Sequence, residues 1–180
     1  MICLVRHGEA AATWGQVPGD PGLSDLGQQQ AESVAQQLMG GGFRYIFASP
    51  MKRCQETSAP FARLSGLAVT TSRAVSEVPT PDGLDDRVAW LQGFMAGTWE
   101  TAPGIVLDWR DALIQQIETL PDNTVVFSHF VAINAVASHF EKSDQVMVFR
   151  PGHCSVTRLE RSGSGMVIAE RGSESATKVL

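Results

Sequence analysis

The segment Arg6-His7-Gly8-Glu9 carries the side chains with the clearest capacity for chemistry in this sequence. It follows an apolar run, residues 2–5, that is typical of a buried strand. Arginine offers a planar set of donors that matches phosphate oxygens, and histidine can be a nucleophile in phosphoryl transfer. Because ligands bind at the carboxyl ends of strands in open α/β sheets, the segment predicts an anion site there. A charged strand end beside an ordinary histidine is the simpler alternative.

The elements that would position these residues alternate between strand and helix. Strands are expected at residues 2–5, 45–48, 67–70, 124–127, 154–159 and 166–170. A helix is expected at residues 24–38 with Ser24 as N-cap, and a second is expected to begin at Ser49-Pro50 with Pro50 at the first helical position. Further helices are expected to begin near residue 84 and to span residues 105–120 and 131–139. This order predicts a three-layer α/β/α sandwich with a mostly parallel central sheet.

The chain is expected to form a single domain over residues 1–180. Residues 78–104 or so, rich in proline and aromatic side chains, read either as an ordinary packed helix or as a small helical cap that lends an apolar wall to a pocket. The polar tail, about residues 171–180, is expected to be loose.

Three of the expected strands end in polar groups that a parallel sheet would bring to one edge. The first ends in Arg6-His7, the second leads through Ser49-Pro50 to Arg53, and the strand at 124–127 ends before His129. Two arginines and two histidines suit a doubly negative phosphate, and helix N-termini near residues 50 and 130 would add positive potential. No metal-ligand spacing is visible, so the economical route is metal-free and cofactor-free, through a phosphohistidine.

The chain resembles the histidine phosphatase superfamily, also called phosphoglycerate mutase-like. The resemblance rests on residues 4–9 (LVRHGE), 23–27 (LSDLG), 49–57 (SPMKRCQET) and 126–129 (VFSH), in this order and spacing. It implies that His7 is the phosphorylated nucleophile. It also implies that Arg6, Arg53 and the catalytic His129 complete the phosphate pocket.

The resemblance further implies a proton donor after the third strand, where Glu77 lies. Glu77 would protonate the leaving oxygen and then activate water against the phosphohistidine. The alternatives are a solvated loop carboxylate at this position, or a donor drawn from the other acidic residues nearby in the motif and the cap: Glu9, Asp82, Asp85 and Asp86.

Two positions depart from the family pattern. Thr13 stands where an asparagine is frequent, and its hydroxyl is a candidate phosphate donor. Phe130 stands where a glycine commonly follows the second histidine; its backbone N–H can still bind an anion, while its ring would narrow the pocket. Trp14 is a possible substrate contact, whereas His139 and His153 are expected to have surface roles.

The function predicted from these residues is that of a metal-independent phosphomonoester hydrolase of the histidine acid phosphatase type. The short segment after Glu77 favours hydrolysis, because mutases must shield the phosphohistidine from water. The alternatives are a phosphoglycerate mutase-like phosphotransferase and a non-catalytic phosphate-binding module. The expected partner is a small-molecule phosphomonoester.

Bulk composition sets wider bounds on partners and location. A net charge of -5 argues against nucleic acid or an anionic membrane as the main partner. No secretory signal or transmembrane run is visible, and the three scattered cysteines favour free thiols in the cytoplasm.

Overall fold

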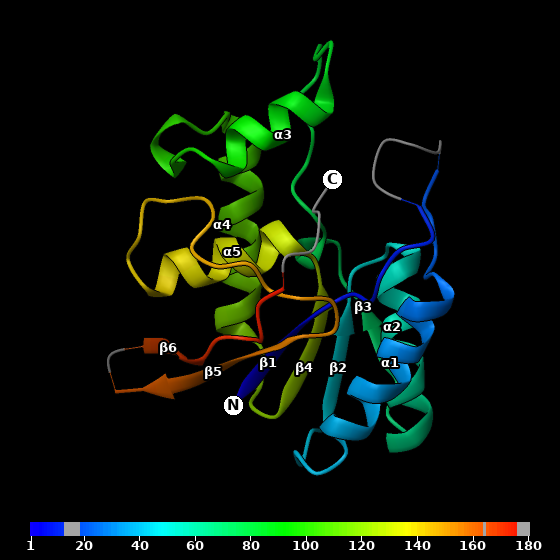
Figure 1. The fold of residues 1–180 in the computed structure, drawn as a ribbon. Helices are drawn as coiled ribbons and strands as arrows, with labels where there is room; N and C mark the ends of the chain where they lie inside the picture. Colours follow the sequence, from blue (N-terminus) through cyan, green and yellow to red (C-terminus); the bar gives the residue numbers. More distant parts are fainter. Residues whose placement is uncertain (13–18, 164, 176–180) are drawn as a thin grey trace.

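The computed structural model describes residues 1–12, 19–163 and 165–175 and contains one mixed sheet in this part of the chain (Figure 1). Its strands are β1 (Ile2–Arg6), β2 (Tyr45–Ala48), β3 (Val69–Thr71), β4 (Thr124–Ser128), β5 (Val156–Ser162) and β6 (Gly165–Glu170). The order across the sheet is β3-β2-β4-β1-β5-β6. The pairs β3–β2, β2–β4 and β4–β1 are parallel, and the pairs β1–β5 and β5–β6 are antiparallel. The sheet is therefore mostly parallel, as predicted.

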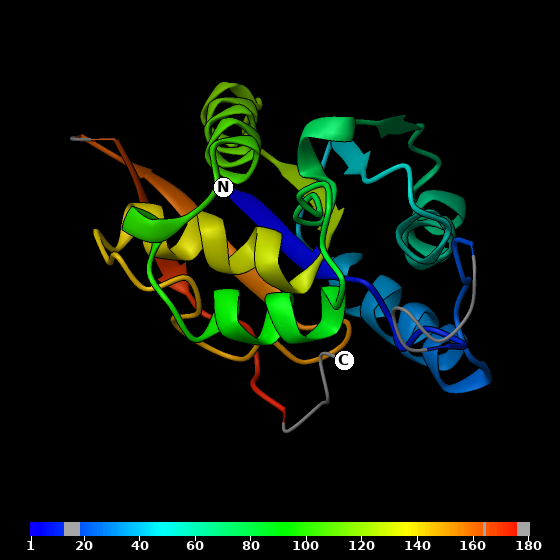
Figure 2. The same cartoon turned by 90° about the horizontal axis from the view of Figure 1, so that it is seen from above.

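Helices cover both faces of this sheet. They are α1 (Asp25–Leu38), α2 (Lys52–Ser65), α3 (Arg87–Met95), α4 (Gly104–Thr119) and α5 (Phe130–Phe140), with short 3-10 helices η1 (Arg73–Val75) and η2 (Trp99–Thr101). Seen from above, α4 and α5 lie on one side of β1 and β4, and α1 and α2 lie on the other (Figure 2). The predicted three-layer sandwich is confirmed.

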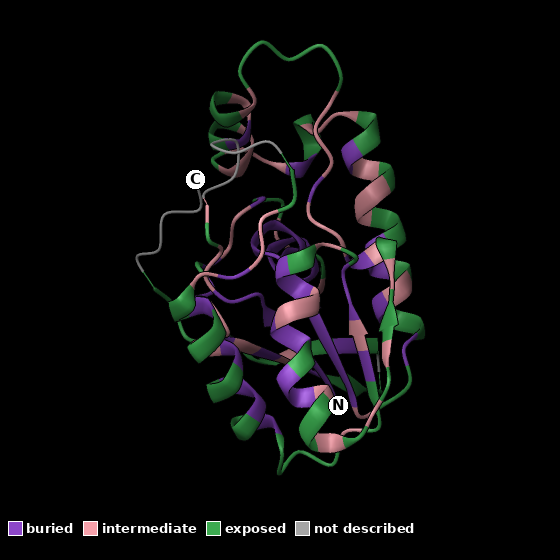
Figure 3. Cartoon of the chain, turned by 90° about the vertical axis from the view of Figure 1, so that its right-hand side faces the viewer, coloured by how far each residue is buried: buried purple, intermediate pink, exposed green. Residues whose placement is uncertain are grey.

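The two-residue period of the strands divides the core between these faces. Leu4 and Val126 pack with α4 and α5, whereas Val5, Val125 and Phe127 pack with α1 and α2. Strands β1 and β4 are buried along their whole length, whereas the outer faces of the helices and the edge strands β3 and β6 carry exposed residues (Figure 3). Continuous apolar runs such as those of β1 and β4 are therefore what this sheet requires.

Several predicted boundaries need correction. Pro50 does not open a helix, because α2 begins at Lys52 after Met51 in extended conformation. Helix α3 begins at Arg87 rather than near residue 84, since the Asp86 side chain caps it by accepting from the Ala89 N–H at 2.9 Å. Strand β5 begins at Val156 rather than residue 154, because Cys154 has a φ of 55° and belongs to a turn.

The segment between η1 and α4 carries α3, which lies beyond the carboxyl ends of the parallel strands (Figure 1). Its aromatic side chains pack on one another: the Trp90 and Phe94 rings stack at 5.4 Å, and Trp99 meets Phe94 edge-on at 5.6 Å. All three contact the core that α4 and α5 share, so this segment is anchored by apolar burial. In the described part of the chain, no helix has the length and apolar character needed to span a bilayer.

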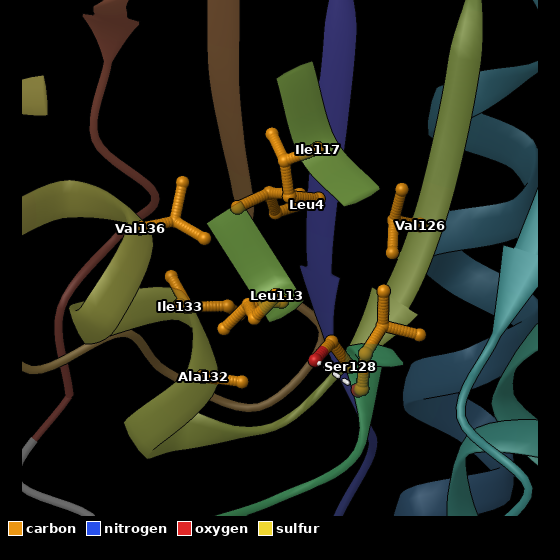
Figure 4. A pocket seen from close by; sticks show the side chains of 9 residues that line it. Leu4, Leu113, Ile117, Val126, Ser128, Ala132, Ile133 and Val136 are labelled. Carbon is orange, nitrogen blue, oxygen red and sulfur yellow. Dashed lines mark hydrogen bonds between the residues drawn. The ribbon is translucent and has the colours of Figure 1, made fainter. Parts of the chain in front are cut away.

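A gap in the packing lies between the sheet and helices α4 and α5 (Figure 4). Apolar side chains surround it together with Ser128, whose hydroxyl donates to the Val75 carbonyl at 2.7 Å. No part of this gap is wide enough to admit a water molecule. It is a feature of the core and not a substrate pocket.

Two glycines allow α1 to touch the loop that follows β1. A Cβ atom at Gly27 would lie 2.0 Å from the Glu9 carbonyl oxygen, and one at Gly8 would lie 2.7 Å from the Gly27 carbonyl oxygen. The predicted N-cap is present, since the Gly27 N–H donates to the Ser24 hydroxyl at 3.0 Å, and the Ser24 N–H donates to the Glu9 carbonyl at 2.9 Å. This contact holds the loop that carries His7 and Gly8 against a rigid helix.

We predict that Gly27→Ala lowers the free energy of unfolding by about 1–3 kcal/mol, because the methyl group must push the loop away from α1. Urea unfolding measures the change. The matched control is Gly93→Ala, another helical glycine, where a Cβ would meet nothing within 4 Å. That variant should be unchanged or more stable by up to about 1 kcal/mol, from helix propensity alone. Equal effects of the two substitutions would contradict the close-contact explanation.

Candidate active site

The ends of three adjacent parallel strands position the predicted site residues. Arg6 is the last residue of β1 and pairs with Ser128, the last residue of β4, so His7 and His129 follow at the same level of the sheet. Strand β2, the other neighbour of β4, leads into α2, which carries Arg53 in its first turn. The structure brings these basic side chains together at one edge.

His7 is held as a neutral imidazole with one unprotonated ring nitrogen. Its Nδ1 lies 2.7 Å from the Gly8 carbonyl oxygen, and since a carbonyl can only accept, Nδ1 carries the proton. Nε2 then has an unprotonated lone pair, which accepts from Arg53 Nε–H at 3.2 Å. Burial, and next the positive charges of Arg53 and Arg6, lower the pKa of His7 well below its usual value. The result is an uncharged imidazole with a fixed orientation.

His129 is the second imidazole of the site and is fully buried. Its Nδ1 accepts from Arg53 Nη2 at 3.2 Å, and its Nε2–H donates to the Ser49 hydroxyl at 2.8 Å. Its ring centroid lies 5.2 Å from that of His7. Burial first, then the neighbouring His7 and Arg53, hold its pKa well below the usual value. Arg53 thus donates to both imidazoles at once.

The guanidinium group of Arg6 is held by the segment that precedes β5. Its Nη1 donates to the Pro151 carbonyl at 2.8 Å and its Nη2 donates to His153 Nε2 at 3.0 Å. The Phe130 ring lies against the guanidinium, 5.1 Å from its carbon to the ring centroid. Burial lowers the pKa of Arg6 to about 10, so it stays a cation at neutral pH. The Phe130 ring therefore packs on Arg6, at the first residue of α5.

Glu77 lies just after η1, and its carboxyl group binds the N-terminus of α5. Oε1 accepts from the N–H groups of Val78 at 3.0 Å and Ala132 at 3.2 Å, and Oε2 accepts from the Val131 N–H at 3.3 Å. Burial is the largest influence and raises the pKa of Glu77, while these hydrogen bonds and Arg53 oppose the shift. A carboxyl group that holds its proton more tightly is suited to act as an acid.

The rival acids have structural partners of their own. Glu9 accepts from the Ser24 hydroxyl at 2.8 Å, and Asp86 caps α3. Asp82 and Asp85 are exposed in the loop before α3. Thr13 and Trp14 lie outside the described residues, so the structure says nothing of their predicted roles.

Sequence reasoning missed residues that brace this site. Asp20 accepts from the Lys52 N–H at 2.7 Å and lies 3.5 Å from Arg53 Nη1, so it offsets part of that positive charge. Thr57 accepts from the Gly8 N–H at 3.0 Å and donates to the Arg53 carbonyl at 2.6 Å. Thr57 is the last residue of the motif at residues 49–57, whereas no local sequence pattern indicates a role for Asp20.

The surface role predicted for His153 is wrong. Its side chain is half-buried and its ring centroid lies 6.0 Å from that of His7. It is 147 residues from Arg6 in the sequence, so no local pattern indicated the contact. His139 is exposed near the end of α5, as predicted.

Comparison with known proteins shows which family the chain resembles. Residues 2–87 match the model of the histidine phosphatase superfamily (branch 1). The fold matches a phosphoserine phosphatase from Entamoeba histolytica solved with 3-phosphoglyceric acid, at a TM-score of 0.75 and 21% identity over 96% of both chains. It also matches a mycobacterial glucosyl-3-phosphoglycerate phosphatase, at a TM-score of 0.73 and 21% identity over 97% of this chain and 99% of the other. The chain is therefore similar to the histidine phosphatase superfamily over residues 2–87, and it shares the fold of these solved phosphatases.

The relatives found by sequence match only part of this chain and only part of their own length. An uncharacterised protein of Mycobacterium tuberculosis (strain H37Rv) is 42% identical over 114 residues, which are 61% of this chain and 48% of the relative. The chain spans between 19% and 48% of the length of the mycobacterial relatives that it matches.

We predict that buried neutral histidines make the protein less stable in mild acid. The unfolded chain takes up protons on histidine below about pH 6.5, whereas the lowered pKa values of His7 and His129 prevent uptake in the folded protein. Stability is therefore lost as the pH falls below about 6.5, by about 1.4 kcal/mol per such histidine at about pH 5.5. Urea unfolding at about pH 7.5 and at about pH 5.5 measures this loss.

The variant His129→Gln should lose about 1.4 kcal/mol less than the wild type between these pH values. The matched control is His139→Gln, at an exposed position, which should keep the wild-type pH dependence. If His129→Gln shows the same pH dependence as the wild type, His129 is not held neutral by the fold.

Proposed function

We propose that this protein is a metal-independent phosphomonoester hydrolase that works through a phosphohistidine on His7. One observation carries the proposal: His7 Nε2 presents a lone pair that is fixed by the Nδ1–H bond to the Gly8 carbonyl and faces Arg53. A neutral imidazole among cations can attack a phosphate dianion, whereas a protonated one cannot. The solved relatives named as phosphatases of phosphoserine and of glucosyl-3-phosphoglycerate support a phosphomonoester as the substrate class.

In the first step, the Nε2 lone pair forms a bond to phosphorus as the bond from phosphorus to the leaving oxygen breaks. Glu77 gives its proton to that oxygen, so the alcohol leaves neutral. In the second step, the Glu77 carboxylate takes a proton from water as the water oxygen bonds to phosphorus and the N–P bond breaks. Inorganic phosphate leaves, and His7 and Glu77 return to their starting protonation states.

Arg6, Arg53 and His129 would stabilise the transferring group. The two guanidiniums donate to its equatorial oxygens, and the charge they provide is worth most in a buried site. His129 accepts from Arg53 in the free protein, so we propose that it takes up a proton when the phosphate dianion arrives. The Phe130 N–H, at the N-terminus of α5, and the Thr13 hydroxyl are proposed as further donors.

The hydrolase is favoured over a phosphoglycerate mutase-like phosphotransferase, because the cap between η1 and α4 is short. The acid phosphatase subtype is supported by the raised pKa of Glu77, because the carboxyl group then keeps its proton up to a higher pH. A non-catalytic binding module would not need both a nucleophile and an acid. A cytoplasmic location is proposed from the three cysteines, which are free thiols.

We predict that His7 forms a covalent phosphoenzyme. Rapid quench with a radiolabelled aryl phosphate should trap phosphate that is labile to acid, stable to base, and attached to His7. His7→Ala should lose about 10³-fold or more of the turnover, since the covalent route is then closed. His139→Ala, at an exposed histidine, should behave as the wild type. Normal turnover by His7→Ala would disprove the mechanism.

We predict that Glu77→Gln slows hydrolysis of alkyl phosphates by about 10²–10⁴-fold and of nitrophenyl phosphate far less, because nitrophenolate leaves without a proton. Activity on alkyl phosphates should fall in the wild type as pH rises through the raised pKa of Glu77, and this limb should vanish in the variant. Steady-state kinetics against pH measures both effects. Glu9→Gln tests the rival donor; if that variant shows the selective loss and Glu77→Gln does not, Glu9 is the acid.

A further inference from the structure

The turn that precedes β5 makes two backbone hydrogen bonds to Arg6, one to its carbonyl and one from its N–H. The Cys154 N–H donates to the Arg6 carbonyl at 3.0 Å, and the Arg6 N–H donates to the Ser155 carbonyl at 3.2 Å. The turn closes on itself through the Ser155 N–H, which donates to the Gly152 carbonyl at 3.1 Å. The φ of 55° at Cys154 is part of this tight geometry. The turn therefore has a fixed register on Arg6, and His153 lies within it.

The same turn also holds the guanidinium group of Arg6. The Pro151 carbonyl accepts from Nη1 at 2.8 Å, and His153 Nε2 accepts from Nη2 at 3.0 Å. The Phe130 ring, from α5, lies against the guanidinium at 5.1 Å. With two hydrogen-bond acceptors on its N–H groups and an aromatic ring against it, the Arg6 guanidinium has little freedom to rotate.

The contact requires a neutral imidazole at position 153. An Arg N–H can only donate, so Nε2 must be unprotonated, and the proton of the ring must lie on Nδ1. Burial first, and then the positive charge of Arg6, lower the pKa of His153 to about 4, with Glu9 opposing the shift. The ring centroid lies 6.0 Å from that of His7, so His153 lies close to His7 as well as to Arg6.

We infer that His153 is a positioning residue for phosphate binding, whose imidazole holds Arg6 Nη2 and so fixes the orientation of the guanidinium toward the phosphoryl group. The inference rests on the proposed function, because it assumes that Arg6 binds the phosphoryl group. It predicts that the hydrogen-bond acceptor at this position matters, and that the imidazole ring as such does not.

Two substitutions separate the acceptor from the shape of the side chain. His153→Gln keeps a carbonyl oxygen close to the position of Nε2, and His153→Leu removes the acceptor. The matched control is His139→Leu, the same change at an exposed histidine. Each change at position 153 is made in the wild type and in Arg6→Ala. Calorimetry with inorganic phosphate gives the affinity, nitrophenyl phosphate gives kcat and KM, and thermal unfolding checks that each variant is folded.

We expect His153→Leu to weaken phosphate binding by about tenfold or more, and His153→Gln to stay within about threefold of the wild type. In Arg6→Ala, His153→Leu should cause no further loss, because the residue acts through Arg6. Should His153→Leu fail to fold, His153→Phe takes its place. The inference is overturned if the acceptor-free variant binds like the wild type, if its loss is the same without Arg6, or if Gln does not rescue.

Binding and turnover also separate this inference from the proposed function. If the wild type binds phosphate but hydrolyses no phosphomonoester, the proposed function fails, and the affinities still decide the role of His153. If the wild type binds no phosphate, Arg6 is not a phosphate ligand and the inference fails. The double-mutant comparison measures affinity and needs no turnover, so it decides the role of His153 even if the protein hydrolyses no phosphomonoester.

Discussion

The chemistry of this site depends on the hydrogen bonds that Arg53 donates to two buried imidazoles. A single guanidinium reaches His7 Nε2 and His129 Nδ1, both at 3.2 Å. Burial first, and then this buried cation, lower the pKa of both rings, so both stay neutral and keep their lone pairs. In the proposed function, an incoming phosphate dianion would reverse that electrostatic balance, because it interacts favourably with the same cation. The positive charge of Arg53 therefore favours the binding of an anion between the two imidazoles and the guanidinium groups.

The strand order explains why the site is enclosed from both sides. Strand β1 lies between β4 and β5, and one neighbour is parallel to it while the other is antiparallel. The parallel neighbour brings His129 to the level of His7. The antiparallel neighbour begins where β1 ends, so the turn that precedes β5 meets Arg6 and delivers His153. A fully parallel sheet would place the start of that strand at the opposite edge.

The fold and the central residues were predictable because their signals are local. Ser24 marks the start of α1, and the apolar runs of β1 and β4 lead directly to Arg6-His7 and His129. Pro50 misled because proline also fits the extended residues before a helix, and α2 begins two residues later. His153 and the bonds of Glu77 to α5 could not be read from the sequence. Each joins segments distant in the chain, and only the packed sheet sets such distances.

The most direct measurement is a crystal structure with vanadate, which adopts the five-coordinate geometry of a transferring phosphoryl group. The account predicts vanadium bonded to His7 Nε2, with Arg6 and Arg53 donating to its equatorial oxygens and the Glu77 carboxyl group facing the oxygen opposite His7. Vanadate bound through His129 or His153, or bound away from this edge of the sheet while His7 keeps its present contacts, would contradict it.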